Sequence, residues 1–97
     1  MTPESRLKNA VMKRLAAVPN SFALKIHGSM FSQAGTPDVL FWRQGRLDPE
    51  SWAFELKVPG NQPTKIQLHR HEEMRHGGVV VVVAYSVADV VAALGLK

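Results

Sequence analysis

In the stretch Trp52-Ala53-Phe54-Glu55-Leu56-Lys57-Val58, two charged residues interrupt an otherwise apolar sequence. This stretch is predicted to be a β-strand, and the segment Pro59–Pro63 breaks the chain directly after it. A strand that is covered on both faces seldom carries two charges without a use, because burying a charge is costly. Glu55 and Lys57 are two residues apart, so they point to the same face of the strand. They are the first candidates for a functional site.

A second predicted strand extends over residues 38–42, and a short connection over residues 43–51 leads from it to the strand just described. A short connection favours antiparallel pairing. Antiparallel pairing brings the start of the earlier strand beside the end of the later one. The sequence therefore predicts that Asp38 lies beside Glu55.

The predicted neighbours Asp38 and Glu55 would repel each other as carboxylates, and a divalent cation relieves such repulsion. Carboxylate and carbonyl oxygens together with water suit Mg²⁺ or Mn²⁺. We expect Leu56 to offer its main-chain carbonyl to the same ion. Lys57 is expected to place an attacking water or to neutralise charge in a transition state.

The alternative interpretation is purely structural, with Asp38 capping a loop and with Glu55 and Lys57 on a solvated strand face. Glu-x-Lys alone is a common pattern and carries little information. The apolar surroundings of this pair favour the functional interpretation.

The remaining sequence predicts an α/β fold. The expected elements are a helix that Thr2 caps and that extends to Val18, strands over 22–27, 38–42 and 52–58, a helix over 64–76, a strand over 79–84 and a helix from Ser86 to Leu94. The order α-β-β-β-α-β-α predicts a three-stranded meander followed by a crossover, which gives a mixed sheet with helices on both faces.

Length and composition limit the possible classes of protein. A chain of 97 residues suggests one domain spanning residues 1–97. The absence of cysteine excludes disulfides and thiolate metal sites. No signal peptide is apparent and no apolar run could cross a membrane, so a cytoplasmic, non-membrane protein is expected. A net charge of +4 favours an anionic partner, of which nucleic acid is the usual one.

Four parts of the sequence together resemble the VRR-nuclease domain of the PD-(D/E)xK superfamily of restriction-like nucleases. They are Gly35-Thr36-Pro37-Asp38-Val39-Leu40, Phe54-Glu55-Leu56-Lys57-Val58-Pro59, Gln67 and Gly77-Gly78. The resemblance extends from Glu4 to Ala88. It implies a restriction-endonuclease-like fold and a metal-dependent endonuclease that hydrolyses DNA phosphodiester bonds.

The resemblance also implies a role for each matching residue. Asp38 and Glu55 would hold the metal, and Lys57 would act on the water or the transition state. Gln67 would orient water or phosphate, although it is equally suited to reciprocate a helix cap at Thr64. The glutamate of the family's first helix matches Glu4, which would be a further metal ligand or simply complement the helix dipole.

Further basic residues are candidates for contacts with DNA phosphates. They are Lys8, Lys13, Arg14, Arg43 and Arg46, each of which has a solvated surface position as its ordinary alternative. His71, one helical turn after Gln67, is expected to line the site, to contact phosphate or, most simply, to be a surface histidine. The tryptophans at 42 and 52 are expected to pack in the core or at its rim.

Stand-alone copies of this length resemble bacterial and phage members that act on branched DNA as dimers. The expected substrate is therefore branched, junction or flap DNA, and a homodimer is expected. The apolar residues 79–83 and the last helix are candidates for the interface. Two other interpretations stay open: a DNA-binding module of the same fold that has lost catalysis, and a structural dimerisation protein. The complete Asp38, Glu55 and Lys57 set argues against both.

Overall fold

The computed structural model describes residues 1–26 and 34–97, and its elements follow the predicted order. They are α1 (Pro3–Ala16), β1 (Ser21–Lys25), β2 (Val39–Gln44), β3 (Pro49–Leu56), α2 (Lys65–His76), β4 (Val80–Ala84) and α3 (Val87–Leu94). The predicted end of the first strand at His27 lies outside the described residues. None of the described helices is long and apolar enough to cross a membrane.

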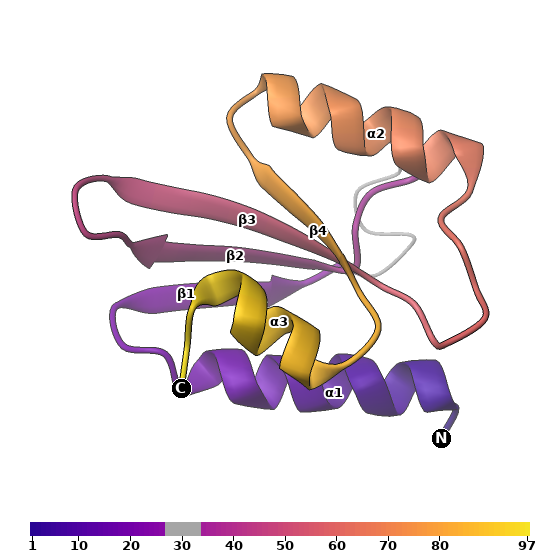
Figure 1. Cartoon of the computed structure of the whole chain (residues 1–97), viewed down its shortest axis with the longest axis horizontal. Helices are drawn as coiled ribbons and strands as arrows, with labels where there is room; N and C mark the ends of the chain where they lie inside the picture. Colours follow the sequence, from indigo (N-terminus) through magenta and orange to yellow (C-terminus); the bar gives the residue numbers. More distant parts are fainter. Residues whose placement is uncertain (27–33) are drawn as a thin grey trace.

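The four strands form one mixed sheet in the order β1-β2-β3-β4. The first three strands pair antiparallel, and β4 pairs parallel to β3. Helices α1 and α3 lie on one face of this sheet and α2 lies on the other (Figure 1). The predicted α/β class, with helices on both faces of a mixed sheet, is confirmed.

The connection between β2 and β3 is shorter than the sequence predicted. The register continues to the pair Gln44–Pro49, which leaves only residues 45–48 in the turn. Proline is tolerated there because it is the first residue of its strand. Across the extended part, Arg43 Nε donates to Glu50 Oε1 at 2.6 Å. This cross-strand ion pair favours the longer hairpin.

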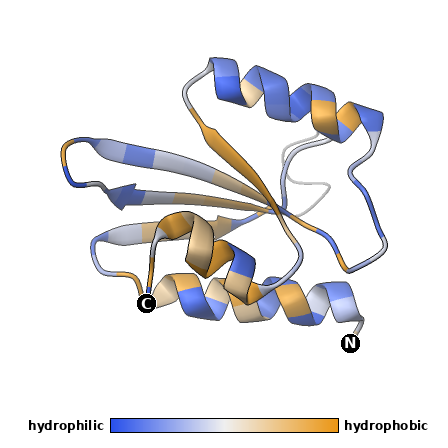
Figure 2. Ribbon diagram, viewed as in Figure 1, coloured by the Kyte–Doolittle hydropathy of each residue, from blue (hydrophilic) through white to orange (hydrophobic). Residues whose placement is uncertain are grey.

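The face covered by α1 and α3 contains the apolar core. Helix α1 buries Val11 and Leu15, and these side chains belong to the same cluster as Phe41, Phe54 and Leu56 of the sheet. Thr2 caps α1, since its side chain accepts the Ser5 N–H, as the sequence predicted. Figure 2 shows apolar residues along β4 and on α3.

The opposite face has a different character, because α2 is mostly hydrophilic (Figure 2). The one buried residue of α2 is His71. Beneath α2 the sheet presents Ala53 and Glu55, both buried. This side of the sheet therefore contains buried polar groups, among them the candidate site residue Glu55.

The turn before Asp38 packs tightly against α2. Gly35 has φ +83°, and a Cβ atom on it would lie 2.6 Å from the carbonyl oxygen of Ile66. Arg70 Nε also donates to the Ala34 carbonyl oxygen at 3.2 Å. The glycine of the Gly-Thr-Pro-Asp motif thus allows the chain to approach α2 closely just before it enters β2.

We predict that Gly35→Ala lowers the free energy of unfolding much more than Gly78→Ala. Gly78 has φ +92°, and a Cβ atom on it would have no neighbour within 4 Å, so its substitution carries only the left-handed backbone cost of about 1–2 kcal/mol. Gly35→Ala adds a clash with backbone that cannot move freely, a further loss of about 1–3 kcal/mol. Urea denaturation of the two variants measures the difference, and equal losses would show that the close approach to α2 is unimportant.

Candidate active site

Asp38 and Glu55 lie side by side where β2 and β3 meet. The last paired residues at this end are Val39 and Phe54, so one further step of the register sets Asp38 opposite Glu55. Asp38 Oδ2 accepts the Leu56 N–H at 2.8 Å, and the two carboxyl side chains are hydrogen-bonded to each other. The juxtaposition predicted from the short β2–β3 connection is confirmed.

Glu55 is buried and is held from α2 through both carboxyl oxygens. His71 Nε2 lies 3.0 Å from Oε1, and Gln67 Nε2 donates to Oε2 at 3.3 Å. Burial, the hydrogen bond to Asp38 and the charge of Asp38 raise the pKa of Glu55 to about 8, and the positive charge of Lys57 opposes this shift. Without a cation beside it, Glu55 therefore retains a proton at neutral pH.

This raised pKa predicts how stability depends on pH in the presence of EDTA. The unfolded chain releases the Glu55 proton near pH 4.5, whereas the folded protein keeps it up to about pH 8. Between these two pH values the folded state binds more protons than the unfolded state. The contribution of Glu55 to the free energy of unfolding is therefore complete below pH 4.5 and is lost as the pH rises through about 8. Glu55→Gln should remove this part of the slope in thermal unfolding between pH 5 and 8.

Glu50→Gln is a suitable control, because the hydrogen bond from Arg43 lowers the pKa of Glu50. A carboxyl with a lowered pKa contributes stability that is lost only as the pH falls below its usual value. The difference between wild type and Glu50→Gln should therefore be constant from pH 5 to 8. A Glu55→Gln variant with the wild-type slope over this range would contradict the burial-raised pKa.

The N-terminal half of α1 approaches the carboxylate pair. Lys8 Nζ lies 3.5 Å from Asp38 Oδ1, so this residue, predicted to contact DNA, lies within the site itself. Glu4, one turn earlier, is exposed, and its charge contributes to the raised pKa of Glu55. Among the described residues, no hydrogen bond or ion pair joins Glu4 to Asp38 or Glu55.

Lys57 directly follows β3 and is half-buried. Its main-chain N–H donates to the Ala84 carbonyl oxygen at 3.0 Å, which fixes the backbone of this residue against the end of β4. Its ammonium charge lowers the pKa of both Glu55 and His71, so it lies on their side of the sheet. No ion pair within the described part of the chain engages this ammonium, which leaves it available to a substrate.

Gln67 forms the helix cap that the sequence offered as one of its roles, and it also contacts Glu55. Its Oε1 accepts the Thr64 N–H at 2.8 Å, which completes a capping box at the start of α2. Its Nε2 donates to Glu55. The cap therefore fixes the side chain in the orientation in which its amide reaches the site.

His71 is fully buried, so the expectation of a surface histidine is wrong. Its ring lies against Glu55, and in this conformation it presents no surface to a phosphate. Burial, followed by the charges of Arg75 and Lys57, lowers the pKa of His71 and keeps the ring neutral. The alternative that His71 lines the site agrees with this position, because a spacing of four residues places Gln67 and His71 on one face of α2.

Two solved structures described as VRR_NUC domains have this architecture. One matches with a TM-score of 0.77 and 26% identity, covering 98% of this chain and 97% of the other. The chain therefore folds as a VRR-nuclease domain. The second, at 19% identity, has a TM-score of 0.73 and covers 98% of this chain and 87% of the other. No protein-family model and no curated protein matches the sequence.

The residues of this candidate site fit a divalent cation. Asp38 and Glu55 bring two carboxyl groups together, and after burial it is Asp38 that raises the pKa of Glu55. Among the described residues, no three histidine, aspartate or glutamate side chains are placed to hold a metal ion. One or two carboxylates completed by water and substrate phosphate are a common Mg²⁺ environment, so the pair at hand meets that requirement.

The other predicted DNA contacts of the VRR-nuclease domain differ in their availability. Arg43 is engaged by Glu50, by the Leu94 carbonyl oxygen at 2.8 Å and by the ring of Trp52. Arg14 donates to the Lys97 carbonyl oxygen at 3.2 Å. Two further cations, Lys13 on α1 and Arg46 in the 45–48 turn, are exposed and form no ion pair within the described residues.

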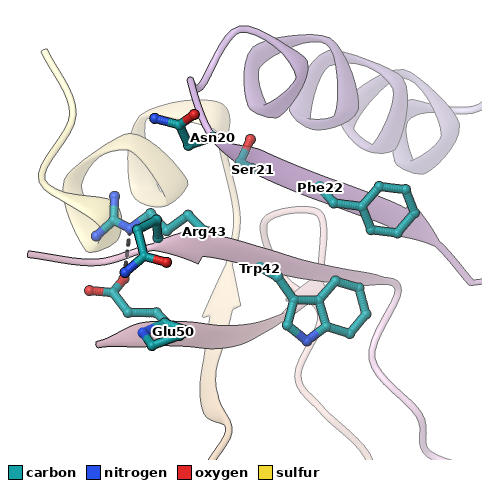
Figure 3. A pocket seen from close by; sticks show the side chains of 8 residues that line it. Asn20, Ser21, Phe22, Trp42, Arg43 and Glu50 are labelled. Atoms are coloured by element: carbon teal, nitrogen blue, oxygen red, sulfur yellow. Dashed lines mark hydrogen bonds and ion pairs between the residues drawn. The ribbon is translucent and has the colours of Figure 1, made fainter. Parts of the chain in front are cut away.

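A shallow pocket lies at the opposite end of β2 from Asp38 (Figure 3). Phe22 and Trp42 stack beside it with ring centroids 5.8 Å apart. Phe22 is 60% exposed and Trp42 38% exposed, so Trp42 is a rim residue. The pocket also adjoins Arg43 and Glu50, whose ion pair closes one side. It contains none of the carboxylates of the candidate site.

Proposed function

We propose that this VRR-nuclease domain is a metal-dependent endonuclease that hydrolyses phosphodiester bonds in DNA, with branched, junction or flap DNA as its preferred substrate. The observation that carries the proposal is the pair formed by Asp38 and buried Glu55, with Lys57 beside it, whose ammonium forms no ion pair with any residue that the structure describes. The preference for branched DNA rests on the family resemblance of the sequence.

Asp38, Glu55 and the Leu56 carbonyl are the residues that would hold Mg²⁺ or Mn²⁺. The N–H and C=O of one strand residue point to the same side of the strand. Because the Leu56 N–H donates to Asp38, its carbonyl faces the same side. When bound, the cation supplies charge neutralisation at the phosphate and lowers the pKa of water.

The other residues act through charge and orientation. Lys57 stabilises the negative charge that develops on the phosphate as the new P–O bond forms, or holds the attacking water. Gln67 orients Glu55 and adds an amide donor near the substrate. Lys8 balances Asp38 until a cation binds. The exposed Lys13 and Arg46 contribute to the attraction of the DNA backbone.

A cleavage assay on plasmid DNA and on a four-way junction, with Mg²⁺, with Mn²⁺ and with EDTA, tests the proposal. We expect cleavage with either cation and none with EDTA, and faster cleavage of the junction. Binding of DNA without cleavage under every condition would support an inactive DNA-binding module instead. Absence of both binding and cleavage would support a structural dimerisation protein.

We also propose that the protein is a homodimer, although not through the last helix, which was one of the two segments that the sequence suggested. Val90 and Leu94 of α3 are buried in the core, and Val87 packs against it. The exposed aromatic pair Phe22 and Trp42 provides apolar surface instead, and a two-fold contact is the usual way to cover such a patch.

Light scattering at micromolar concentration should give the mass of a dimer for wild type and of a monomer for Trp42→Gln. Leu47→Gln is the control, since Leu47 is also an exposed apolar residue but lies in the 45–48 turn. It should remain a dimer. A monomeric wild type would remove the dimer and weaken the proposal of symmetric cleavage at a junction.

A further inference from the structure

Helix α2 buries a histidine where a helix on a sheet ordinarily buries apolar side chains. Two of its three apolar residues, Ile66 and Leu68, are 49% and 50% exposed, whereas His71 is fully buried. Burial of apolar surface alone would have turned a different side of the helix inward. The orientation of α2 therefore has another determinant, and the partner of His71 identifies it.

That partner is the carboxyl group of Glu55. His71 Nε2 lies 3.0 Å from Oε1, and Gln67 Nε2 lies 3.3 Å from Oε2. The two α2 residues are four apart and approach the same carboxylate from successive turns. Two donors on two oxygens fix the rotation of the carboxylate, which a single contact would leave free.

The other ring nitrogen of His71 indicates the tautomer. Nδ1 is buried and has no hydrogen-bond partner among the described residues. A buried N–H without an acceptor is rarer in proteins than an acceptor without a donor. The hydrogen therefore resides on Nε2, which donates to Glu55 Oε1, and Nδ1 is a bare acceptor.

We propose that His71 is a positioning residue that orients Glu55 for the divalent cation. This inference rests on the proposed function, because it assigns a role at the same site. His71 acts through Glu55 and does not itself bind the ion, since Nε2 is occupied by the carboxylate and Nδ1 is enclosed. Residues that orient a ligand in this way ordinarily contribute about 10- to 100-fold to metal affinity.

Calorimetric titration of the DNA-free protein with Mn²⁺ tests the proposal without relying on activity. His71→Leu should weaken Mn²⁺ binding by about 10- to 100-fold. His71→Gln should recover most of this loss, because its amide N–H replaces the ring donor. His69→Leu is the matched control on the same helix, since His69 is exposed and should leave the affinity unchanged. Thermal unfolding in EDTA verifies that each variant is folded, since His71→Leu removes the orphaned nitrogen but also leaves Glu55 Oε1 without its donor from α2.

The results separate this inference from the proposed function. If wild type binds no Mn²⁺, both are overturned. If wild type binds Mn²⁺ and folded His71→Leu binds it within twofold as tightly, only the role of His71 is overturned. Recovery of Mn²⁺ affinity in His71→Gln would support the hydrogen bond to Glu55. If His71→Gln binds Mn²⁺ as weakly as His71→Leu, His71 contributes only by packing.

The tautomer can be measured on the wild-type protein, which keeps the proposal testable even if His71→Leu does not fold. Long-range ¹H–¹⁵N correlation spectra of the imidazole should show a protonated Nε2 and a bare Nδ1, both with and without Mg²⁺. A hydrogen on Nδ1 would overturn the donor role.

Discussion

Lys57→Met is expected to slow DNA cleavage by about 100- to 1,000-fold while DNA affinity changes little. Methionine retains an unbranched apolar stem and removes only the ammonium group. No ion pair within the described residues involves Lys57, so the substitution leaves no carboxylate without a partner. A charge that stabilises the transition state more than the bound substrate speeds the chemical step. Its removal therefore slows that step.

Single-turnover cleavage at saturating DNA and saturating Mg²⁺ measures this rate, and fluorescence anisotropy in Ca²⁺ measures affinity. Saturating metal is needed because the charge of Lys57 favours the ionised form of Glu55. Lys13→Met is the matched control, since Lys13 is an exposed lysine on α1. It should cleave at the wild-type rate. If Lys57→Met also cleaves at the wild-type rate, Lys57 takes no part in the chemical step. If Lys57→Met loses only DNA affinity, Lys57 is a phosphate contact.

The sequence was sufficient to bring Asp38 and Glu55 together, because that prediction depended on local features. A short connection enforces antiparallel pairing, and pairing decides which strand ends are neighbours. The same holds for the caps at Thr2 and Thr64, whose partners lie three residues away in the chain. In each case the interacting groups are close in sequence or are linked by one hairpin.

The roles of His71 and Arg43 could not be predicted in this way, because each depends on a docking geometry. Helix α2 has no continuous apolar stripe, so its periodicity does not indicate which face meets the sheet. Only the position of Glu55 decides that His71 is buried. Arg43 was expected to contact phosphate, but the hairpin extends past the predicted strand ends and sets Glu50 opposite it.

Asp38→Asn is expected to weaken Mn²⁺ binding by more than about 100-fold and to abolish detectable cleavage. Loss of a residue that only orients a ligand already costs up to about 100-fold, so loss of a ligand charge should cost more. Asparagine has nearly the same shape, and its side-chain oxygen can still accept the Leu56 N–H that Asp38 accepts at 2.8 Å. The local backbone should therefore be retained.

Without metal, the same substitution should make the free energy of unfolding less sensitive to pH. The charge of Asp38 contributes to the raised pKa of Glu55, so its removal allows Glu55 to ionise at lower pH. Asp38→Asn should then be less destabilised than wild type when the pH in EDTA rises from 5 to 8. Asp48→Asn, in the exposed 45–48 turn, is the control for both measurements and should behave as wild type. Loss of Mn²⁺ affinity in a variant that is stable in EDTA and has a flatter pH dependence would be specific to a carboxylate pair, because general misfolding lowers the Mn²⁺ affinity and the free energy of unfolding together. Equal Mn²⁺ affinity in wild type and Asp38→Asn would exclude Asp38 as a metal ligand.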